Sequence, residues 1–214
     1  MSVALMEESF LDDVREGITF NLAPLNVEQY HQMVRNGILH DGDPIELIQG
    51  SLVYKDRRDK TGGIMTHGAR HLLVLKRLTA ILNRWAEDKT CHLQAQGPIT
   101  VNDTSEPEPD CCLVRGTPDD YADEVPHADD VLAVFEVAYS SLRSDRRIKQ
   151  RLYARAGIPF YVILNLQDDV IEVLSEPSTD EARYTAQTLH RDTETIALPL
   201  GDFGPLSFDA DDLL

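Results

Sequence analysis

The chain is poor in positive charge, and this shortage excludes one class of protein. Among its 214 residues, 20 Lys and Arg stand against 37 Asp and Glu, which gives a formal net charge of −17. Proteins that coat nucleic acid by bulk electrostatic attraction need clustered cations, so the composition argues against that class. The composition still allows a local basic cleft, because binding of nucleic acid depends more on where the charges lie than on the net charge.

Long apolar runs and cysteines are also scarce. No run approaches the roughly 18 apolar residues of a membrane span, and the first residues, MSVALMEESFLDD, lack a basic region followed by an apolar stretch. Cys91, Cys111 and Cys112 are odd in number and two are adjacent, which makes a poor disulfide framework. We therefore expect a cytoplasmic protein with no membrane partner.

The pattern of apolar and turn residues predicts one α/β domain over residues 25–214, preceded by a flexible tail over residues 1–24. Asn26 and Gln29 are spaced as a capping box at the start of the first helix, and Gly157 is placed to end the third. Helices are expected over 27–36, 65–87 and 144–156, and strands over 45–54 (a hairpin), 92–101, 111–116, 131–138, 160–166, 170–176 and 182–189. The buried stripe of the second helix is expected from Leu72, Leu75, Leu78, Ile81, Leu82 and Trp85. The last segment, FDADDLL, is expected to be a surface strand end or a tail.

Glu136 is the one charged residue in an otherwise apolar predicted strand. The segment VLAVFEVA (131–138) has the composition of a central strand covered on both faces. An isolated ionised carboxylate there would cost several kcal/mol unless a cation or several donors compensated it. Glu136 therefore either lies at the strand end, where residues 139–141 turn toward solvent, or has a partner.

Asp110 supplies a second carboxylate of the same kind. It ends the segment SEPEPD (105–110) and opens the apolar run CCLV, and Pro109 restricts the approach to an extended conformation. Two carboxylates on adjacent strands can converge at one strand end and share a divalent cation, and oxygen ligands select Mg²⁺ or Mn²⁺. The alternative is that Asp110 only caps a turn.

A basic predicted helix supplies the cations that the overall composition lacks. The basic residues of its region are Arg143, Arg146, Arg147, Lys149, Arg151 and Arg155. Asp145, Lys149 and Tyr153 are spaced i, i+4 and i+8, which places them on one helix face. Lys149 either pairs with Asp145 at the surface, worth about 0.3–0.5 kcal/mol, or points toward Glu136, where an ammonium can orient a water or offset charge on a phosphate.

The order of an aspartate, a strand glutamate and a lysine resembles the PD-(D/E)xK nuclease superfamily. Longer strings resemble its Uma-type family over about residues 27–173: ELIQG (46–50), QGP (96–98), SEPEPD (105–110) and EVAYSSLRSDRRIKQRLYARAGIPFYVILNL (136–166). The resemblance implies a restriction-endonuclease-like α/β fold. Its αβββαβ core has a mixed central sheet flanked by helices, to which the last predicted strands would add a C-terminal β meander.

The resemblance also implies roles for individual residues. Asp110 and Glu136 match the metal ligands, and Glu46 matches an upstream catalytic glutamate. The sequence departs from the plain superfamily pattern at Ala138, where a strand lysine is expected. Lys149 instead matches a catalytic lysine that the Uma-type pattern carries on the next helix.

A wider set of residues is expected to support this site. His71 matches the family's helix histidine better than His67 does, and Gln96 matches the glutamine before the Gly-Pro step. The remaining candidates are Asp145 and Tyr153, on the face of Lys149, and Arg146, Arg147 and Arg151, which are expected to contact backbone phosphates.

Each supporting assignment has a structural alternative. Glu46 could be an exposed strand position, His71 a polar residue at the boundary of an apolar helix face, and Gln96 a hydrogen-bonding residue at a strand edge. The basic stretch KDRRDK (55–60) is either a solvated loop or the wall of a substrate groove.

Together these expectations describe an endonuclease that uses Mg²⁺ or Mn²⁺ and a metal-bound water to hydrolyse nucleic acid. DNA is the expected substrate, and a homodimer is plausible. One alternative is a catalytically silent member of the fold that acts in binding or assembly, which the charge of −17 and the missing strand lysine favour. Another is a hydrolase of a small phosphorylated substrate, which needs no long basic groove.

Overall fold

A computed structural model of the protein describes residues 23–40, 42–55 and 68–214. The expected tail and the basic stretch at 55–60 lie almost wholly outside the described residues, as do His67 and the expected start of the second helix. The elements are α2 (Val27–Arg35), β1 (Ile45–Ile48), β2 (Ser51–Tyr54), α3 (Ala69–Ala86), β3 (Cys91–Ala95), β4 (Cys111–Arg115), β5 (Val131–Ala138), α4 (Leu142–Ser144), α5 (Gln150–Arg155), β6 (Phe160–Asn165), β7 (Val170–Ser178), β8 (Arg183–His190), β9 (Thr195–Pro199) and β10 (Pro205–Asp209).

A six-stranded sheet forms the centre of the fold. Its order is β3-β4-β5-β6-β7-β8, and every neighbouring pair is antiparallel except β5 and β6, which are parallel. All eight residues of β5 are buried, as expected for an apolar strand with neighbours on both edges and cover on both faces. The predicted mixed sheet and its C-terminal meander are confirmed.

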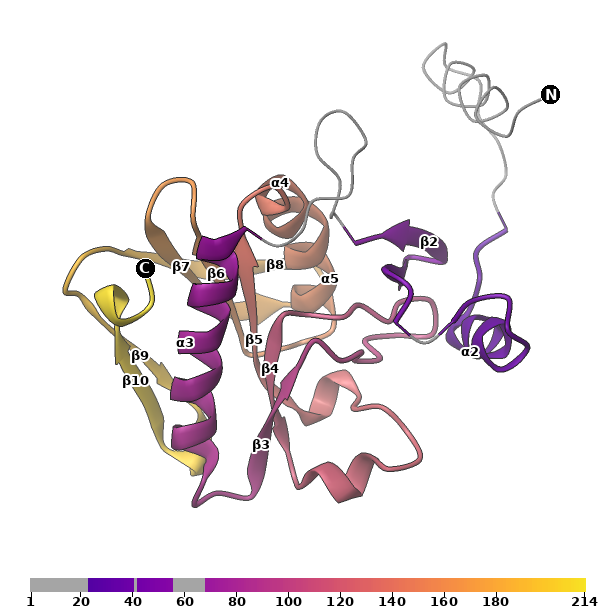
Figure 1. Cartoon of the computed structure of the whole chain (residues 1–214), viewed down its shortest axis with the longest axis horizontal. Coiled ribbons are helices and arrows are strands. Elements are labelled where there is room, and N and C mark those ends of the chain that lie inside the picture. The colour runs from indigo at the N-terminus through magenta and orange to yellow at the C-terminus, as the bar shows by residue number, and fades with distance from the viewer. Residues whose placement is uncertain (1–22, 41, 56–67) are drawn as a thin grey trace, which may run out of the picture.

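Helices cover the two faces of this sheet, as Figure 1 shows with α3 in front of the strands and α5 behind them. The α3 side buries Phe135 and Val137 of β5 together with Leu78 and Leu82 of the helix. The α5 side buries the alternate β5 residues Val134 and Ala138, together with Leu152 and Tyr153. Because strand side chains alternate between faces, Glu136 belongs to the α5 side.

The buried stripe of α3 differs in phase from the prediction. The buried residues are Val74, Leu78, Leu82 and Ala86, one every four residues, whereas Leu72 is 40% exposed. The remaining predicted residues, Leu75, Ile81 and Trp85, are partly buried beside this row. Residues spaced by four lie on one side of a helix, so this row forms the side of α3 that packs on the sheet.

The C-terminal segment is part of the core, which corrects the expectation of a tail. Strands β9 and β10 form an antiparallel hairpin, and Phe208, Ala210 and Leu213 are buried on the α3 side of the sheet. Pro199 and Pro205, which pair with each other at the turn end of the hairpin, and the acidic residues of FDADDLL hide this alternation in the sequence.

The basic helix has a break in its regular geometry. It starts at Leu142, two residues before the expected start, and passes through a π-helical turn over Asp145–Lys149, where the Gln150 N–H donates to the carbonyl of Asp145. A regular α-helix follows, and Gly157 after it adopts φ +76°, as predicted for a helix-ending glycine.

The hairpin β1–β2 and helix α2 lie together at one end of the molecule. The predicted capping box of Asn26 and Gln29 is present. The Tyr30 hydroxyl donates to the carbonyl of Ile45, and the Glu106 N–H donates to the carbonyl of Leu47. These bonds fix the hairpin against the loop that leads into β4, and so bring Glu46 toward Asp110. Within the described residues, no helix combines the length and apolar character that crossing a membrane requires.

Candidate active site

A cavity of about 450 Å³ lies beside the carboxyl end of β5. The hairpin β1–β2, the first turn of α3, the loop after β5 and the π-helical turn all contribute to its wall. Seven of the predicted site residues line it: Glu46, His71, Gln96, Asp110, Glu136, Asp145 and Lys149. Segments that are far apart in the sequence therefore meet at this cavity.

The two central carboxylates lie on neighbouring antiparallel strands. Cys111 pairs with Phe135 across β4 and β5, so Asp110 and Glu136 are the next residues along. The Val137 N–H donates to Asp110 Oδ2 at 2.8 Å, and the Asp110 N–H donates to Glu136 Oε2 at 3.3 Å. Each carboxylate is therefore held by the backbone of the other segment rather than by a mobile loop.

Lys149 points into the cavity and contacts Glu136. Its Nζ lies 2.8 Å from Glu136 Oε1 and 3.8 Å from Glu46 Oε2. The Tyr153 hydroxyl, one helical turn farther on, donates to the same Oε1 at 3.4 Å. Of the two arrangements that the spacing allowed, the structure has the ammonium facing Glu136 and not a surface pair with Asp145.

Asp145 is nearly inaccessible, with 1% exposure, although it begins a strongly basic segment. Among the described residues, its Oδ2 is a buried oxygen without a hydrogen-bond partner. Burial raises the pKa of Asp145 to about 6, against the opposing charge of Lys149. Near neutral pH this carboxylate adds negative charge to the cavity.

Burial and charge act differently on the other ionisable groups. Burial raises the pKa of Glu136 to about 8, the Lys149 ammonium opposes the rise, and the charges of Asp110 and Asp145 reinforce it. Burial alone would lower the pKa of Lys149, but the surrounding carboxylates, Glu136 first, hold it well above its usual value. The ammonium therefore stays charged across the physiological range.

Asp110 is the carboxylate most strongly held in its ionised form. Burial would raise its pKa, but contact with His71 and the Val137 N–H bond outweigh that effect and lower it. His71 Nε2 lies 3.5 Å from Asp110 Oδ2. The cavity thus contains one firmly ionised carboxylate beside one that is held partly protonated near neutral pH.

Glu46 and Gln96 complete the wall opposite the sheet. Glu46 is buried, which excludes the exposed strand position considered above, and its Oε2 accepts a bond from the Glu108 N–H at 3.1 Å. The Gln96 N–H donates to the carbonyl of Asp110, from a backbone with φ +52°.

Glu108 was missed from the sequence. It lines the cavity and forms an ion pair with Lys55. The signal was present in EPEPD, because prolines on both sides of Glu108 keep the segment extended and place residues 108 and 110 on the same side.

The three predicted phosphate-binding arginines lie outside the cavity. Arg146 binds Glu172 and approaches Asp168, while Arg147 and Arg151 lie exposed on the helix. The part of the chain that the structure describes therefore brings no arginine of this helix to the carboxylates.

The donor chemistry of the cavity fits a hydrated divalent cation. Five carboxyl side chains, those of Glu46, Glu108, Asp110, Glu136 and Asp145, line the cavity with three cationic ones, Lys55, Arg70 and Lys149, so acidic groups outnumber basic ones. Among the described residues, no group of three or more His, Cys, Asp or Glu side chains is arranged to hold a metal ion by itself. Mg²⁺ does not need such a site, since it keeps several waters and takes one or two carboxylates.

Comparisons with known proteins show which family and which fold the chain shares. A family model named Uma2 and described as "Putative restriction endonuclease" matches residues 27–204. A crystal structure from Anabaena variabilis, described as that of "a putative nuclease belonging to DUF820", superposes with a TM-score of 0.62 at 12% identity, and covers 89% of this chain and 97% of that one. At this identity the superposition shows a shared fold. The comparison with curated proteins gave no match.

Proposed function

Because the chain belongs to the Uma2 family of restriction-endonuclease-like proteins, which gives it a nuclease-like role, we propose that it hydrolyses phosphodiester bonds, with DNA as its substrate and Mg²⁺ or Mn²⁺ as its cofactor. The observation that carries this proposal is the group formed by Asp110, Glu136 and Lys149 in one cavity. Two carboxylates and an ammonium at a strand end are the groups that a metal-dependent phosphodiesterase needs.

In this proposal, Asp110 and Glu136 hold the metal together with the carbonyl of Val137, and Glu46 completes the set or holds a second cation. A divalent cation there polarises the phosphate and lowers the pKa of its bound water. The Lys149 ammonium orients the attacking water or offsets the charge that develops on the phosphoryl oxygens. Asp145 and Tyr153 keep that ammonium in the cavity, and His71 supports Asp110.

The cofactor also has a role in the ionisation of the site. Burial raises the pKa of Glu136 to about 8, so this group is partly protonated near neutral pH, and a protonated carboxyl is a poor ligand. A cation beside Glu136 favours its charged form and lowers that pKa. Metal binding is therefore expected to release a proton and to strengthen as the pH rises.

The test is cleavage of supercoiled plasmid and of labelled oligonucleotides by the purified protein with Mg²⁺, with Mn²⁺ and with a chelator. Asp110→Asn, Glu136→Gln and Lys149→Met should each lower the rate by about 100-fold or more, since each removes a group that acts on the developing charge. Glu181→Gln, which removes an exposed carboxylate paired with Arg183, is the matched control and should leave the rate unchanged. Full activity of Glu136→Gln would contradict the proposal.

The second candidate is a catalytically silent protein that uses this fold for binding. The pairing of cavity cations with carboxylates favours it, since Lys149 is bound to Glu136 and Lys55 to Glu108. It predicts no cleavage with any metal and no rise in melting temperature with Mg²⁺. Cleavage that mononucleotides inhibit, without any inhibition by DNA, would instead indicate a small phosphorylated substrate.

Location and assembly belong to the same proposal. The three cysteines are free and buried, which supports a reducing, cytoplasmic location. A homodimer would supply two sites for cutting the two strands of a duplex.

A further inference from the structure

Two buried glutamates lie in one row across the sheet. Glu136 of β5 pairs with Ile163 of β6, and Ile163 pairs with Glu172 of β7. Residues that are paired across a sheet point to the same face, so Glu172 lies on the α5 side, as Glu136 does. Neighbouring strands are about 4.8 Å apart, which places the two carboxylates on the order of 10 Å from each other.

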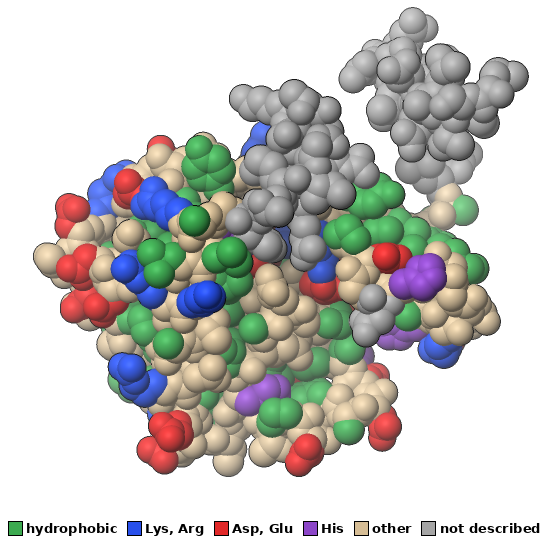
Figure 2. Space-filling model, in the orientation of Figure 1, with side chains coloured by type: hydrophobic (Ala, Val, Ile, Leu, Met, Phe, Trp, Pro, Cys, Tyr) green, Lys and Arg blue, Asp and Glu red, His purple; other side chains and the backbone are tan. Residues whose placement is uncertain are grey.

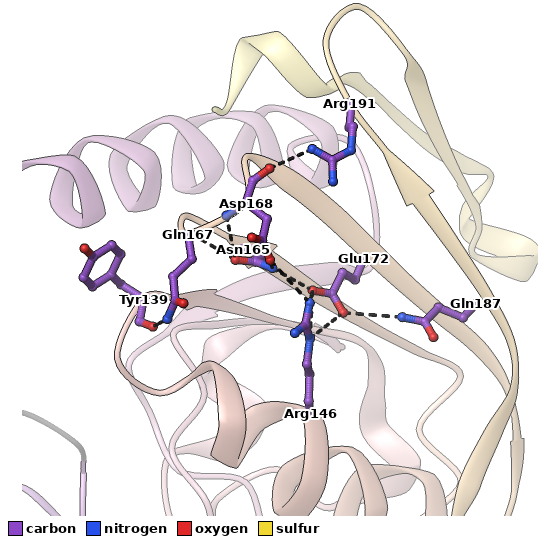
Figure 3. Close-up of polar contacts among 8 residues, drawn as sticks. All are labelled: Tyr139, Arg146, Asn165, Gln167, Asp168, Glu172, Gln187 and Arg191. Carbon is purple, nitrogen blue, oxygen red and sulfur yellow. Dashed lines mark hydrogen bonds and ion pairs between the residues drawn. The ribbon is translucent and has the colours of Figure 1, made fainter.

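Glu172 is 1% exposed and is bound in a polar network that Figure 3 shows. Arg146 Nε lies 3.1 Å from each carboxylate oxygen, and its Nη2 lies 2.6 Å from Oε1. Asn165 Nδ2 donates to the same Oε1 at 3.1 Å, and Gln187 Nε2 donates to Oε2 at 3.4 Å. The Arg146 fork therefore fits a carboxylate that surrounding side chains already hold in place.

The cations of both glutamates come from the same π-helical turn. Arg146 binds Glu172 and Lys149 binds Glu136, so two residues three apart in the sequence are fixed to two points of one row. A single contact leaves a helix free to rotate about it. Two contacts separated across the sheet fix both its rotation and its position along its axis.

The π-helical turn makes this second contact important. One extra residue in a turn shifts every following side chain around the helix axis, and such turns are uncommon. Within it Asp145 is buried, its carbonyl accepts a 3.4 Å bond from the Tyr161 hydroxyl, and Ile148 is 48% exposed. A regular α-helical turn here would change the angle between Arg146 and Lys149 around the helix axis, and both ion pairs depend on that angle.

We propose that Arg146 and Glu172 are positioning residues, whose ion pair holds the π-helical turn so that Lys149 stays in contact with Glu136. Arg146 thus acts through the helix and contacts no phosphate. The consequence for catalysis rests on the proposed function, whereas the effect on Lys149 is a property of the folded chain alone.

A purely stabilising role would not require this chemistry. Neither exposed nor buried ion pairs are strong sources of stability, and this pair joins a buried carboxylate to an arginine that is 43% exposed. What the arginine fork adds is direction, because it accepts a carboxylate only in a narrow range of geometries. Arg146 has this directional geometry, because its Nε and its Nη2 both contact the Glu172 carboxylate.

The direct test observes the Lys149 ammonium by nuclear magnetic resonance. The chain has five lysines, so the side-chain spectrum is simple, and Lys149→Arg identifies the Lys149 signal by its loss. Glu172→Gln keeps the shape of the side chain and removes its charge. We expect the Lys149 signal to shift or broaden in this variant, while Glu181→Gln, which breaks the exposed pair with Arg183, leaves it unchanged.

Arg146→Lys is the second variant, since it keeps the charge on a side chain that is 43% exposed and removes only the fork. It is expected to fold and to move the Lys149 signal less than Glu172→Gln does. An unchanged Lys149 signal in folded Glu172→Gln overturns the proposal. If that variant does not fold, an unchanged signal in Arg146→Lys overturns it instead.

Kinetics distinguish positioning from phosphate contact. If the pair positions Lys149, Glu172→Gln lowers kcat about tenfold, as is typical of residues that orient a site from behind, and leaves KM within about twofold. A rise in KM with unchanged kcat, and the same change in Arg146→Lys, would indicate a phosphate contact and overturn the proposal. If the unmodified protein cleaves nothing, the proposed function fails, and the resonance comparison still decides the role of the pair.

Discussion

Glu136 is an acidic residue in a strand position that the surrounding pattern would fill with an apolar one. The strand is buried along its whole length, and Glu136 itself is 5% exposed. Its compensation comes from the Lys149 ammonium and the Asp110 N–H. A buried ionisable residue of this kind lowers the free energy of unfolding, and functional sites commonly trade stability for activity.

The pH dependence of stability should reveal that cost. Burial raises the pKa of Glu136 to about 8 in the folded protein, whereas a glutamate in the unfolded chain titrates near about 4.3. Between these values the folded state binds more protons, so the free energy of unfolding falls as the pH rises from about 4 to about 8. Asp145 acts in the same direction up to about pH 6.

Glu136→Gln removes this titration and should therefore stabilise the protein at pH 8. We expect a gain of at least about 1 kcal/mol, or roughly 2–4 °C in melting temperature for a chain of this size, and little change near pH 5. Thermal melts followed by circular dichroism between pH 5 and pH 8.5 measure it. A variant that is less stable than the unmodified protein at pH 8 would show that the ionised Glu136–Lys149 pair stabilises the fold.

At the scale of elements, the predicted strands were found because their residues alternate or run apolar between clear turn signals. The helix face that joins Lys149 to Tyr153 was also readable from spacing, and so was the extended approach to Asp110. The partner of Arg146 was not, because Glu172 in VIEVLSE has the pattern of an exposed strand position. Its burial depends on which face α5 covers, and that is decided by tertiary packing.

The π-helical turn escaped prediction for a related reason. Its sequence, DRRIK, has ordinary helix formers, and local propensity does not distinguish an α turn from a π turn. In our proposal, the contacts of Arg146 and Lys149 with two different strands hold the extra residue in place. Seven of the predicted site residues thus line one cavity, while the helix geometry that arranges them was not predicted.

The end of this helix offers a test by glycine replacement. Gly157 has φ +76°, and an added Cβ would meet only Thr179 Cγ2 at 3.7 Å, an ordinary contact. Gly157→Ala should cost about 1–2 kcal/mol, because the strain comes from the left-handed backbone alone. Denaturant unfolding measures the loss.

Gly68→Ala is the matched control for that experiment. Gly68 has ordinary φ, and an added Cβ would have no atom within 4 Å among the described residues. This variant should unfold within about 0.5 kcal/mol of the unmodified protein. Equal losses at both positions would show that crowding or helix capping, and not left-handed strain, sets the cost at Gly157.

At the scale of the whole molecule, the charge of −17 limits how nucleic acid can bind. Figure 2 shows that the Lys and Arg side chains of the described residues on this face are interspersed with acidic and hydrophobic ones. The cations nearest the cavity also have carboxylate partners: Lys55, Lys149 and Arg70 contact Glu108, Glu136 and Asp169. If the protein binds DNA and a metal as proposed, the described residues around the cavity offer few phosphate contacts besides the metal.

Salt dependence measures the number of those contacts. With one or two phosphates neutralised, affinity for DNA should fall about tenfold or less between 50 and 200 mM salt, far less than the roughly 10³-fold loss of a protein with six contacts. Fluorescence anisotropy with a labelled duplex and Ca²⁺ gives the slope. If Arg147 or Arg151 does contact a phosphate, replacing it with Gln reduces the slope by about one. A steep slope that neither variant reduces would mean that other cations hold the substrate.

The position of the cysteines gives this protein a natural reporter. Cys111 and Cys112 directly follow Asp110, both are fully buried, and burial raises the pKa of Cys111 to about 12. Alkylating reagents attack the thiolate, so they have almost nothing to modify until β4 leaves the sheet. The rate of labelling therefore measures how often β4, the strand that directly follows Asp110, leaves the sheet. No foreign probe has to be inserted.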